Sequence, residues 1–507
     1  MLSLVIFLPL AAAAVLVAAP RVPERAARWT WVAVTTLDLL LVVGVWARSG
    51  LSGGSGARGV TGGLVFTEQV RWIPNVGSSY HVGLDGLSLP LVALTAVVFL
   101  ACAVYSLRTR HRPRANAALF LFLQTSCLGV FAAQDLILFF VFFDLSIVGM
   151  YFVIAGWGHG DAARSALKFF LYTFFGSLAL LLGFIGLYLA SAPHTFDMVS
   201  LAANPPLQGR PVAGGFVMAA LLIGLAVKTP TFPFHTWLPP AHTDAPATGS
   251  AVLAGVLLKL GTYGFVRIAM PQLPEAWRAF AWVIVAVGVV SVLYGALVAL
   301  AQTDLKRMIA YTSVNHMGYV VLAVGAAGVV GGPGGDGGAG STVAVTGAVT
   351  QMVSHGLITG ALFLLAGVMY ERTGTYDMGS FGGLAGPAPR FAVLLALGAF
   401  ASLGLPGFSG FIAEFQVFAG SLGPVPIATA LALPGILITA ALFLRALQTV
   451  LMGPTTARST GFGDLRPAEV WSIAPLLALT VVLGVFPRPV LAVIEPASRA
   501  VVDLVTR

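Results

Sequence analysis

The sequence predicts an all-α polytopic membrane protein with about fourteen transmembrane helices, and two observations carry that prediction. Of the 507 residues, 58% are hydrophobic and only 9% are charged, whereas a soluble protein carries about 25% charge. Apolar runs of about 18 to 28 residues recur almost from end to end, and that is the length a helix needs to cross roughly 30 Å of hydrocarbon. The expected crossings are 2–19, 28–48, 84–107, 115–133, 135–156, 166–190, 213–234, 246–270, 277–301, 305–329, 343–370, 389–418, 426–452 and 468–493.

The net charge of +8 is a topology signal and not a sign of nucleic-acid binding. About fifteen Lys and Arg residues fall in the loops after odd-numbered helices, and about six in the loops after even-numbered ones. The positive-inside rule therefore places the odd-numbered loops in the cytoplasm, so that fourteen crossings leave both termini outside. The first crossing lacks the basic segment that precedes a signal peptide's apolar core, and we expect it to stay as a helix.

Acidic residues mark the first part of the chain. Asp38, inside helix 2, is explained equally well by hydrogen-bonded packing and by chemistry, and Asp85 in GLDGLSLPL is expected to cap helix 3. The Gly/Ser-rich loop 49–79 is expected on the outer surface. Asp144 lies in the aromatic middle of helix 5, where a carboxylate needs a nearby cation or a proton. Lys228 is the candidate cation, and a neutral Asp144 hydrogen-bonded to a neighbouring helix is the alternative.

The stretch from Gly214 to Met270 combines a helix break with two lysines. Pro230 and Pro233 each remove a backbone donor, so helix 7 must break there. Lys228 stands just before the break and Lys259 lies near the middle of helix 8, although a lysine at bilayer depth costs roughly 2.5 to 3.5 kcal/mol. Only four of the 27 cationic residues are lysines, and lysine, unlike arginine, can release its proton when desolvated. The pattern favours a proton path, because transporters build ion sites at broken helices.

The second half of the chain repeats this arrangement. His316 in helix 10 and His355 in helix 11 lie at similar depth, and histidine exchanges protons near neutral pH, which favours a relay over two isolated buried histidines. Gly404 and Pro406 in SLGLPGFSGF predict a second break, followed by Glu414 at membrane depth. Breaks in the seventh and twelfth helices, five apart, predict two inverted five-helix repeats, helices 4–8 and 9–13.

These repeats divide the chain into four regions and leave no cofactor site. The expected regions are 1–110 with helices 1–3, 111–270 with helices 4–8, 271–452 with helices 9–13, and 453–507 with helix 14.

Cys102 and Cys127 lie singly in helices 3 and 4, so no iron–sulfur or zinc site is expected. Gly331 to Gly340 is a linker without the lysine and hydroxyl of a phosphate cradle. His235 and His242 are expected to make structural hydrogen bonds in the loop after the first break.

Several motifs together resemble one known family. VKTPTFPFHTWLPPAHTDAPATGSAVLAGVLLKLGTYG is similar to the broken helix 7 and helix 8 of the antiporter-like subunits of respiratory complex I, which are related to the Mrp cation/proton antiporters. GLDGLSLPL, DLKRMIAYTSVNHMGY, MVSHGLITGALFLLAGVMYER and GLPGFSGFIAEF are similar to further motifs of the same group, so that the resemblance extends from residue 83 to about 420. Within the group, Glu414 in place of lysine, the AHTDAPATGS loop and a length without room for a long lateral helix favour the M type of NADH:quinone oxidoreductase over the L type.

The resemblance implies a role for six residues: Asp144 and Lys228 as an ion pair, Lys259 as the central relay, His316 and His355 as parts of a polar axis, and Glu414 as the group that hands protons to the far side. The family usually has glutamate at the position of Asp144. Because aspartate is one methylene shorter, its contact with Lys228 would need a small helix displacement or a bridging water.

The resemblance also implies partners and cofactors. This chain would bind no cofactor itself, and NADH, FMN, iron–sulfur clusters and quinone would belong to partner subunits. L-type and N-type antiporter-like subunits would flank it, with small J/K-type subunits in the same membrane arm. Lipids would surround it in a bacterial plasma membrane, and protons would be the transported species.

The implied mechanism is electrostatic. Separation of Asp144 from Lys228 would leave the lysine charge unpaired, and its field would drive the proton of Lys259 towards Glu414. At an effective dielectric near 20, two unit charges about 7 Å apart interact by roughly 2.4 kcal/mol, enough to switch occupancy. Two alternatives remain: an Mrp-type cation/proton antiporter subunit built from the same parts, and a membrane haem protein that uses His235, His316 and His355.

Overall fold

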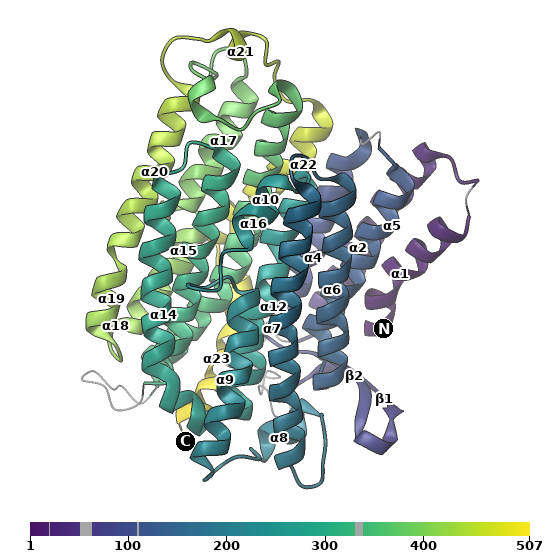
Figure 1. Ribbon diagram of the computed structural model, residues 1–507, viewed down its shortest axis with the longest axis vertical. Coiled ribbons are helices and arrows are strands. Elements are labelled where there is room, and N and C mark those ends of the chain that lie inside the picture. The colour runs from purple at the N-terminus through teal and green to yellow at the C-terminus, as the bar shows by residue number, and fades with distance from the viewer. Residues whose placement is uncertain (20, 51–62, 109–110, 330–337, 507) are drawn as a thin grey trace.

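The chain forms a bundle of long helices that run side by side along one axis (Figure 1). The computed structural model describes residues 1–19, 21–50, 63–108, 111–329 and 338–506. Among these residues, eleven helices are long and apolar enough to cross a membrane. Three further expected crossings correspond to the shorter α1, the more polar α15 and the interrupted pair α17 and α18. The polytopic helical fold is confirmed, whereas the count of fourteen and the inverted repeat stay predictions.

The first half of the bundle contains the helices α1 Leu2–Ala18, α2 Glu24–Arg48, α4 Ser88–Tyr105, α5 Pro113–Ala132, α6 Leu136–Trp157, α7 Ala162–Ala190, α8 Met198–Ala203, α9 Pro211–Lys228, α10 Leu238–Asp244, α11 Ala247–Val252, α12 Leu258–Gly264 and α13 Met270–Gln272.

The second half contains α14 Pro274–Leu300, α15 Leu305–Ala326, α16 Ala339–Thr373, α17 Pro389–Ser402, α18 Ser409–Leu422, α19 Pro426–Ala432, α20 Pro434–Leu451, α21 Ala457–Thr460, α22 Pro467–Val485 and α23 Arg488–Thr506. Short 3₁₀ turns lie at Pro74–Val76, Ser106–Arg108 and Met378–Ser380.

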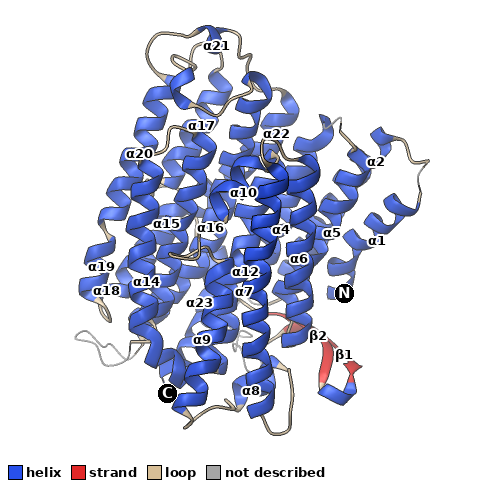
Figure 2. Cartoon of the chain, viewed as in Figure 1, coloured by secondary structure: helices blue, strands red, loops and turns tan. Residues whose placement is uncertain are grey.

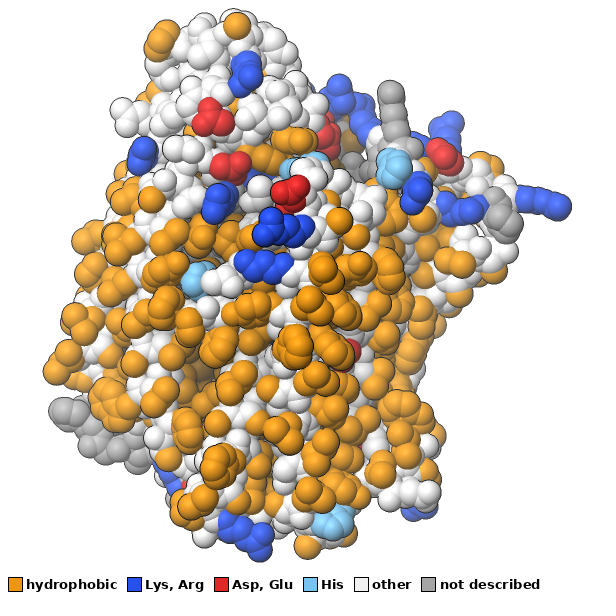
Figure 3. Space-filling model, in the orientation of Figure 1, with side chains coloured by type: hydrophobic (Ala, Val, Ile, Leu, Met, Phe, Trp, Pro, Cys, Tyr) orange, Lys and Arg blue, Asp and Glu red, His pale blue; other side chains and the backbone are white. Residues whose placement is uncertain are grey.

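The surface separates apolar from charged side chains as a membrane protein requires. Orange apolar side chains cover the middle of the face shown in Figure 3, and the blue cationic side chains gather mainly towards its upper part. Many large apolar side chains are exposed on the helices, including Phe175 at 68% and Trp282 at 59%. A soluble protein rarely exposes so continuous an apolar surface, and lipid is its natural solvent.

A β-hairpin is added to the helical bundle. Strand β1, Val65–Ile73, pairs antiparallel with β2, Ser78–Leu84, and Figure 2 shows them as the red element at the lower end of the bundle. Gly77 closes the turn with φ 63°, a conformation that glycine adopts without strain. The glycine-rich composition of the loop 49–79 hid the alternation of Tyr80, Val82 and Leu84 in the second strand. Residues 51–62 of that loop lie outside the described residues.

Side chains of this hairpin hold it against the bundle. His81 Nδ1 lies 2.5 Å from Asp197 Oδ2, next to the N-terminus of α8. Burial raises the pKa of Asp197, but hydrogen bonds from His81 and Ser200 outweigh burial and hold that pKa below its ordinary value. Glu68 also accepts a bond of 2.5 Å from the terminal ammonium of Met1. The hairpin is therefore a fixed part of the lower end.

The C-terminal region differs from the predicted helix 14. The crossing expected at 468–493 ends at Val485, and a separate helix, α23, begins at Arg488. The apolar side chains of α23 fall on one face and are buried, whereas Arg499 and Glu495 on the other face are 64% and 55% exposed. Such an amphipathic helix packs on a protein surface, and α23 packs against α13, α14 and α16. The linker residues 331–337 and Arg110 lie outside the described residues.

Candidate functional site

Both predicted helix breaks are confirmed. Helix α9 ends at Lys228, and α10 begins ten residues later at Leu238; α17 ends at Ser402, and α18 begins at Ser409. A feature that the sequence did not predict lies between them: π-helical turns at Leu253–Leu257 and Phe265–Ala269 flank α12, which carries Lys259. Because π-turns shift the backbone hydrogen-bond pattern, they change which carbonyls a nearby side chain can reach.

Lys259 is completely buried and contacts a backbone carbonyl and a histidine. Its Nζ donates to the carbonyl oxygen of Ala254, in the first π-helical turn. The same Nζ lies 2.7 Å from His355 Nδ1 on α16. The exposed fraction of Lys259 is 0% and that of His355 is 2%. The structure thus brings together the two residues that were predicted as relay and polar axis.

His316 continues this contact towards α18. Its ring centroid lies 5.4 Å from that of His355, in an edge-on arrangement. Its Nε2 lies 3.2 Å from the carbonyl oxygen of Ser402, the last residue of α17, and 3.7 Å from Glu414 Oε1. Glu414 is 6% exposed and sits against the second break. Four of the six predicted site residues therefore form one buried row: Lys259, His355, His316 and Glu414.

The hydrogen-bond partners set the direction of the two imidazoles. The Ser402 carbonyl can only accept, so Nε2 of a neutral His316 carries the proton and Nδ1 is left as the acceptor. If Lys259 is protonated, it donates to His355 Nδ1, which leaves the proton of neutral His355 on Nε2. Neither His355 Nε2 nor His316 Nδ1 has a hydrogen-bond partner in the described part of the chain. The ring with the free donor and the ring with the free acceptor thus have their centroids 5.4 Å apart.

Lys228 and Asp144 lie apart from this row. Lys228 is 1% exposed, its Nζ lies 3.3 Å from Ser146 Oγ, and it sits 4.8 Å from the centre of the Phe143 ring. Asp144 is only partly buried, and its Oδ1 has no hydrogen-bond partner in the described part of the chain. Among those residues no ion pair joins Asp144 to Lys228, and their pairing stays a prediction.

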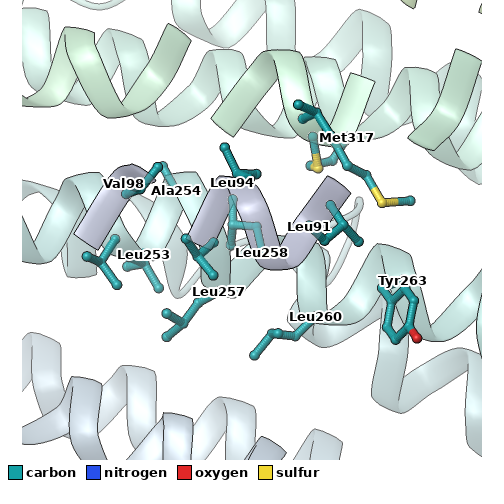
Figure 4. Close-up of a cluster of buried hydrophobic side chains, with 14 of the residues drawn as sticks. Leu91, Leu94, Val98, Leu253, Ala254, Leu257, Leu258, Leu260, Tyr263 and Met317 are labelled. Carbon is teal, nitrogen blue, oxygen red and sulfur yellow. The ribbon is translucent and has the colours of Figure 1, made fainter. Parts of the chain in front are cut away.

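Apolar side chains enclose the lysine-bearing helix. Figure 4 shows Leu91, Leu94 and Val98 of α4 beside Leu253, Leu257 and Leu258, with Met317 of α15 close by. All of these side chains are 3% exposed or less. This layer keeps lipid away from the row and lowers the local dielectric, which strengthens each electrostatic interaction inside it.

The sequence did not identify two residues that lie on the side of the row towards the start of α15. Lys306, at the start of α15, is 0% exposed, and its Nζ lies 2.6 Å from the carbonyl oxygen of Ala245 and 3.2 Å from Tyr376 Oη. His242 on α10 was expected to make structural hydrogen bonds. Its buried ring stacks on Phe363 at 4.5 Å instead, and neither ring nitrogen has a hydrogen-bond partner in the described residues. Lys306 is one of only four lysines among the 27 cationic residues, and this scarcity could have marked it as a candidate site residue.

A second buried polar cluster also escaped the sequence. Asp85 caps α4 as predicted, because its Oδ1 accepts from the backbone N–H groups of Leu87 and Ser88. Its other carboxylate oxygen lies 2.7 Å from Arg267 Nη1. In this ion pair the Arg267 side chain is 0% exposed and the Asp85 side chain is 2% exposed. Arg267 also donates to Gln134. Asp38 accepts a bond of 2.6 Å from Gln124, so the packing role is confirmed there.

The described residues contain no group of three or more His, Cys, Asp or Glu side chains that could hold a metal ion. The ring of His235 packs between the rings of Phe232 and Tyr294, with centroid distances of 5.9 and 4.8 Å. Only His316 and His355 of the three histidines face one another.

Comparison with known proteins adds the family. The family described as NADH:quinone oxidoreductase/Mrp antiporter, TM, matches residues 133–439. NADH-quinone oxidoreductase subunit M of Rickettsia prowazekii is 39% identical over 433 residues, which cover 84% of each chain. F(420)H(2) dehydrogenase subunit M of Methanosarcina mazei is 38% identical over 88% of each chain. A chain in the structure of respiratory complex I from Thermus thermophilus with bound NADH superposes with a TM-score of 0.87 and 31% identity over the full length of both chains.

The family match spans more than half of the sequence, and the two curated relatives carry the name of the M subunit. The chain belongs to the NADH:quinone oxidoreductase/Mrp antiporter transmembrane family, as a member of the M type.

Proposed function

We propose that this chain is a membrane-arm subunit of NADH:quinone oxidoreductase that moves protons across the membrane along the row Lys259, His355, His316 and Glu414. The observation that carries the proposal is the contact of Lys259 with His355, continued through the facing His316 to Glu414. Burying a chain of groups that can each hold and release a proton costs free energy. Apolar residues would pack this part of the bundle without that cost.

The row moves a proton in discrete steps. Protonated Lys259 gives its proton to His355 Nδ1, and His355 releases the proton of Nε2 towards the free Nδ1 of His316, directly or across a water. His316 then passes the proton of Nε2 to Glu414, which lies 3.7 Å away. Each ring then carries its proton on Nδ1, and it returns to its starting arrangement by rotating the imidazole before the next proton arrives.

Lys228 and Asp144 supply the control. Lys228 lies at the first break, beside the helix that carries Lys259: a side-chain carbon added at Gly261 would lie 2.8 Å from the backbone nitrogen of Thr229. When Asp144 approaches Lys228, it compensates the lysine charge, and Lys259 can be loaded; when Asp144 withdraws, the unpaired charge favours transfer away from Lys259. Because Asp144 is partly exposed on α6, a neighbouring subunit can change its position.

The remaining features of the proposal concern the assembly. The chain has no redox centre of its own and acts as a translocase part, while NADH, FMN, iron–sulfur clusters and quinone are held by partner subunits. L-type, N-type and J/K-type subunits adjoin it in a bacterial plasma membrane. The charge bias places the loop between helices 9 and 10 in the cytoplasm and both termini outside, so that Lys306 lies on the proton-uptake side.

The rival function is that of an Mrp-type cation/proton antiporter subunit, because the family description includes both kinds of protein. The M. mazei relative belongs by name to a dehydrogenase of a different electron donor. Stimulation of proton movement by sodium in vesicles would favour the antiporter, and proton movement that needs NADH and quinone alone would favour the oxidoreductase.

A pair of substitutions at one position tests the proposal. Lys259→Met keeps the length of the side chain but cannot carry a proton, and we expect the assembled complex to release fewer protons for each electron transferred. Lys259→Arg keeps the charge but cannot release it, and we expect the same loss. The measurement is proton release against NADH oxidation in sealed vesicles. An unchanged ratio in both variants would exclude the relay.

A further inference from the structure

We propose that protons leave Glu414 through a polar cavity between α16, α18 and α23, and that the charged face of α23 forms the outer wall of this exit. This inference rests on the proposed function and adds the release side of the path. The cavity has a volume of about 420 Å³. Its polar lining comes from three helices: Thr342 and Thr346 of α16, Gln416 of α18, and Glu495, Arg499 and Asp503 of α23.

Two buried groups that line the cavity lack protein partners. Thr346 is 2% exposed, and its hydroxyl has no hydrogen-bond partner in the described part of the chain. Oε1 of Gln416 is also a buried atom without a hydrogen-bond partner in the described residues. Buried polar groups are almost always satisfied by protein or by water, and a cavity of this size holds a cluster of waters. Both groups therefore mark the inner end of a hydrated space.

The packing of α16 against α18 places Glu414 close to this inner end. The two helices run antiparallel: Ser354 Oγ lies 2.7 Å from Ser409 Oγ, and a side-chain carbon at Gly347 would lie 2.8 Å from Cβ of Gln416. In each facing pair the residue numbers add to 763, so Glu414 lies level with about residue 349 of α16. Thr346 is then within one helical turn of Glu414 along the axis, roughly 5 Å.

Hydroxyl groups connect that level to the cavity. Thr342, Thr346, Thr350 and Ser354 follow one another four residues apart, which places them on one face of α16. Thr350 Oγ1 donates to the carbonyl oxygen of Thr346 at 2.8 Å, and Thr342 Oγ1 donates to that of Gly338 at 3.0 Å. A hydroxyl group can both donate and accept a hydrogen bond. Waters ordered along this face can therefore carry a proton outward.

Helix α23 completes the path on the surface. Glu495, Arg499 and Asp503 are also four residues apart, with Arg499 Nη2 3.3 Å from Glu495 Oε1. Arg278 of α14 fixes the C-terminal end of α23, because its Nη1 lies 2.6 Å from the carbonyl oxygen of Val505. Two carboxylates at the mouth would accept hydrogen bonds from the waters that deliver a released proton to bulk water.

Thiol labelling of the assembled complex in sealed vesicles tests this exit. We expect a membrane-impermeant thiol reagent to label Thr346→Cys from the side that carries the termini, and to lower the protons released for each electron. Thr429→Cys is the matched control: Thr429 is 1% exposed on α19, its hydroxyl is bonded to Val425, and it does not line the cavity. Cys102 and Cys127 are buried, and the parent complex reports their background.

Thr346→Val and Thr346→Ser provide a second readout that needs no reagent. We expect the valine variant, which has the same shape but no hydroxyl, to release fewer protons for each electron, and the serine variant to match the parent. Absence of labelling at Thr346→Cys, labelling without an effect on release, or full release by Thr346→Val would each overturn the exit. If Lys259→Met also pumps normally, the relay itself fails; if it does not, only the exit fails.

Discussion

At the scale of single residues, the geometry of Lys259 explains why a lysine is used. An ammonium group has three donors, and the carbonyl of Ala254 and Nδ1 of His355 use two of them. Both acceptors are neutral, so the charge of Lys259 is solvated without a permanent counter-ion. A fixed carboxylate would hold the proton in place. Arginine would keep its charge under all physiological conditions.

Glu414 provides the prediction at this scale. Glu414→Gln keeps the shape of the side chain but cannot accept a proton from His316, and we expect the complex to release fewer protons for each electron. Glu414→Asp retains the carboxylate but shortens the side chain by one methylene, which lengthens the gap of 3.7 Å, and we expect an intermediate loss. Simultaneous recording of proton release and NADH oxidation in vesicles checks both. Normal release by the glutamine variant would remove Glu414 from the path.

At the scale of elements, the interrupted helices share one feature: they present backbone carbonyls to residues of the buried row. The carbonyl of Ala254 lies in a π-helical turn and receives the Lys259 ammonium. The carbonyl of Ser402 ends α17 and receives His316. A continuous α-helix would bind each of these carbonyls internally, and only its last turn leaves them open. The breaks thus place hydrogen-bond acceptors at membrane depth without adding charge.

Gly404 at the second break gives the prediction at this scale. It has φ +75°, and a side-chain carbon there would lie 2.5 Å from Oε2 of Glu414. We expect Gly404→Ala to push Glu414 away from His316 and to lower proton release for each electron.

Gly407→Ala is the matched control. Gly407 has φ +99° but no atom within 4 Å of the added carbon. Both alanines carry a backbone strain of about 1 to 2 kcal/mol, which thermal denaturation of the complex would report for each. Equal pumping by the two variants would show that the contact with Glu414 is without consequence.

At the scale of the whole molecule, buried polar contacts fix the lower end of the bundle around the row. The ion pair of Arg267 with Asp85 ties the helix that carries Lys259 to the start of α4. The bond of His81 to Asp197 ties the hairpin to the segment before α8. Because the second π-helical turn contains Arg267, its side chain and that of Lys259 move as parts of one helical segment. The anchor therefore sets the depth of the lysine.

The same ion pair gives the prediction for the molecule. Arg267→Met leaves Asp85 buried without its cation, and breaking a buried pair in this way costs about 3 to 5 kcal/mol. We expect a lower melting temperature of the purified complex or poor assembly. The double variant Arg267→Met with Asp85→Asn removes both charges, and we expect it to recover much of the stability. A double variant no better than the single one would show that the ion pair is not the source of the loss.

Much of the fold could be predicted from the sequence because hydrocarbon imposes simple rules. Long apolar runs become helices. Pro230 and Pro233 interrupt the first of the broken helices, and Pro406 interrupts the second. The hairpin and α23 could not be predicted in this way, because they lie at the ends of the bundle, where water can satisfy any backbone conformation. The π-helical turns beside Lys259 also carry no sequence pattern: the first packs against α4 and α16, and the second packs against α9.

The sequence by itself determined which titratable residues lie at membrane depth, because each of them stands out against apolar neighbours. It indicated Lys259, His316, His355 and Glu414 as a set, but not their order or their contacts. The tertiary structure decided that these four form one buried row, that Lys228 contacts Ser146 and Phe143, and that Arg267 pairs with Asp85. The reason is physical: hydropathy depends on composition along the chain, whereas proton contacts depend on how helices far apart in sequence rotate and pack against one another.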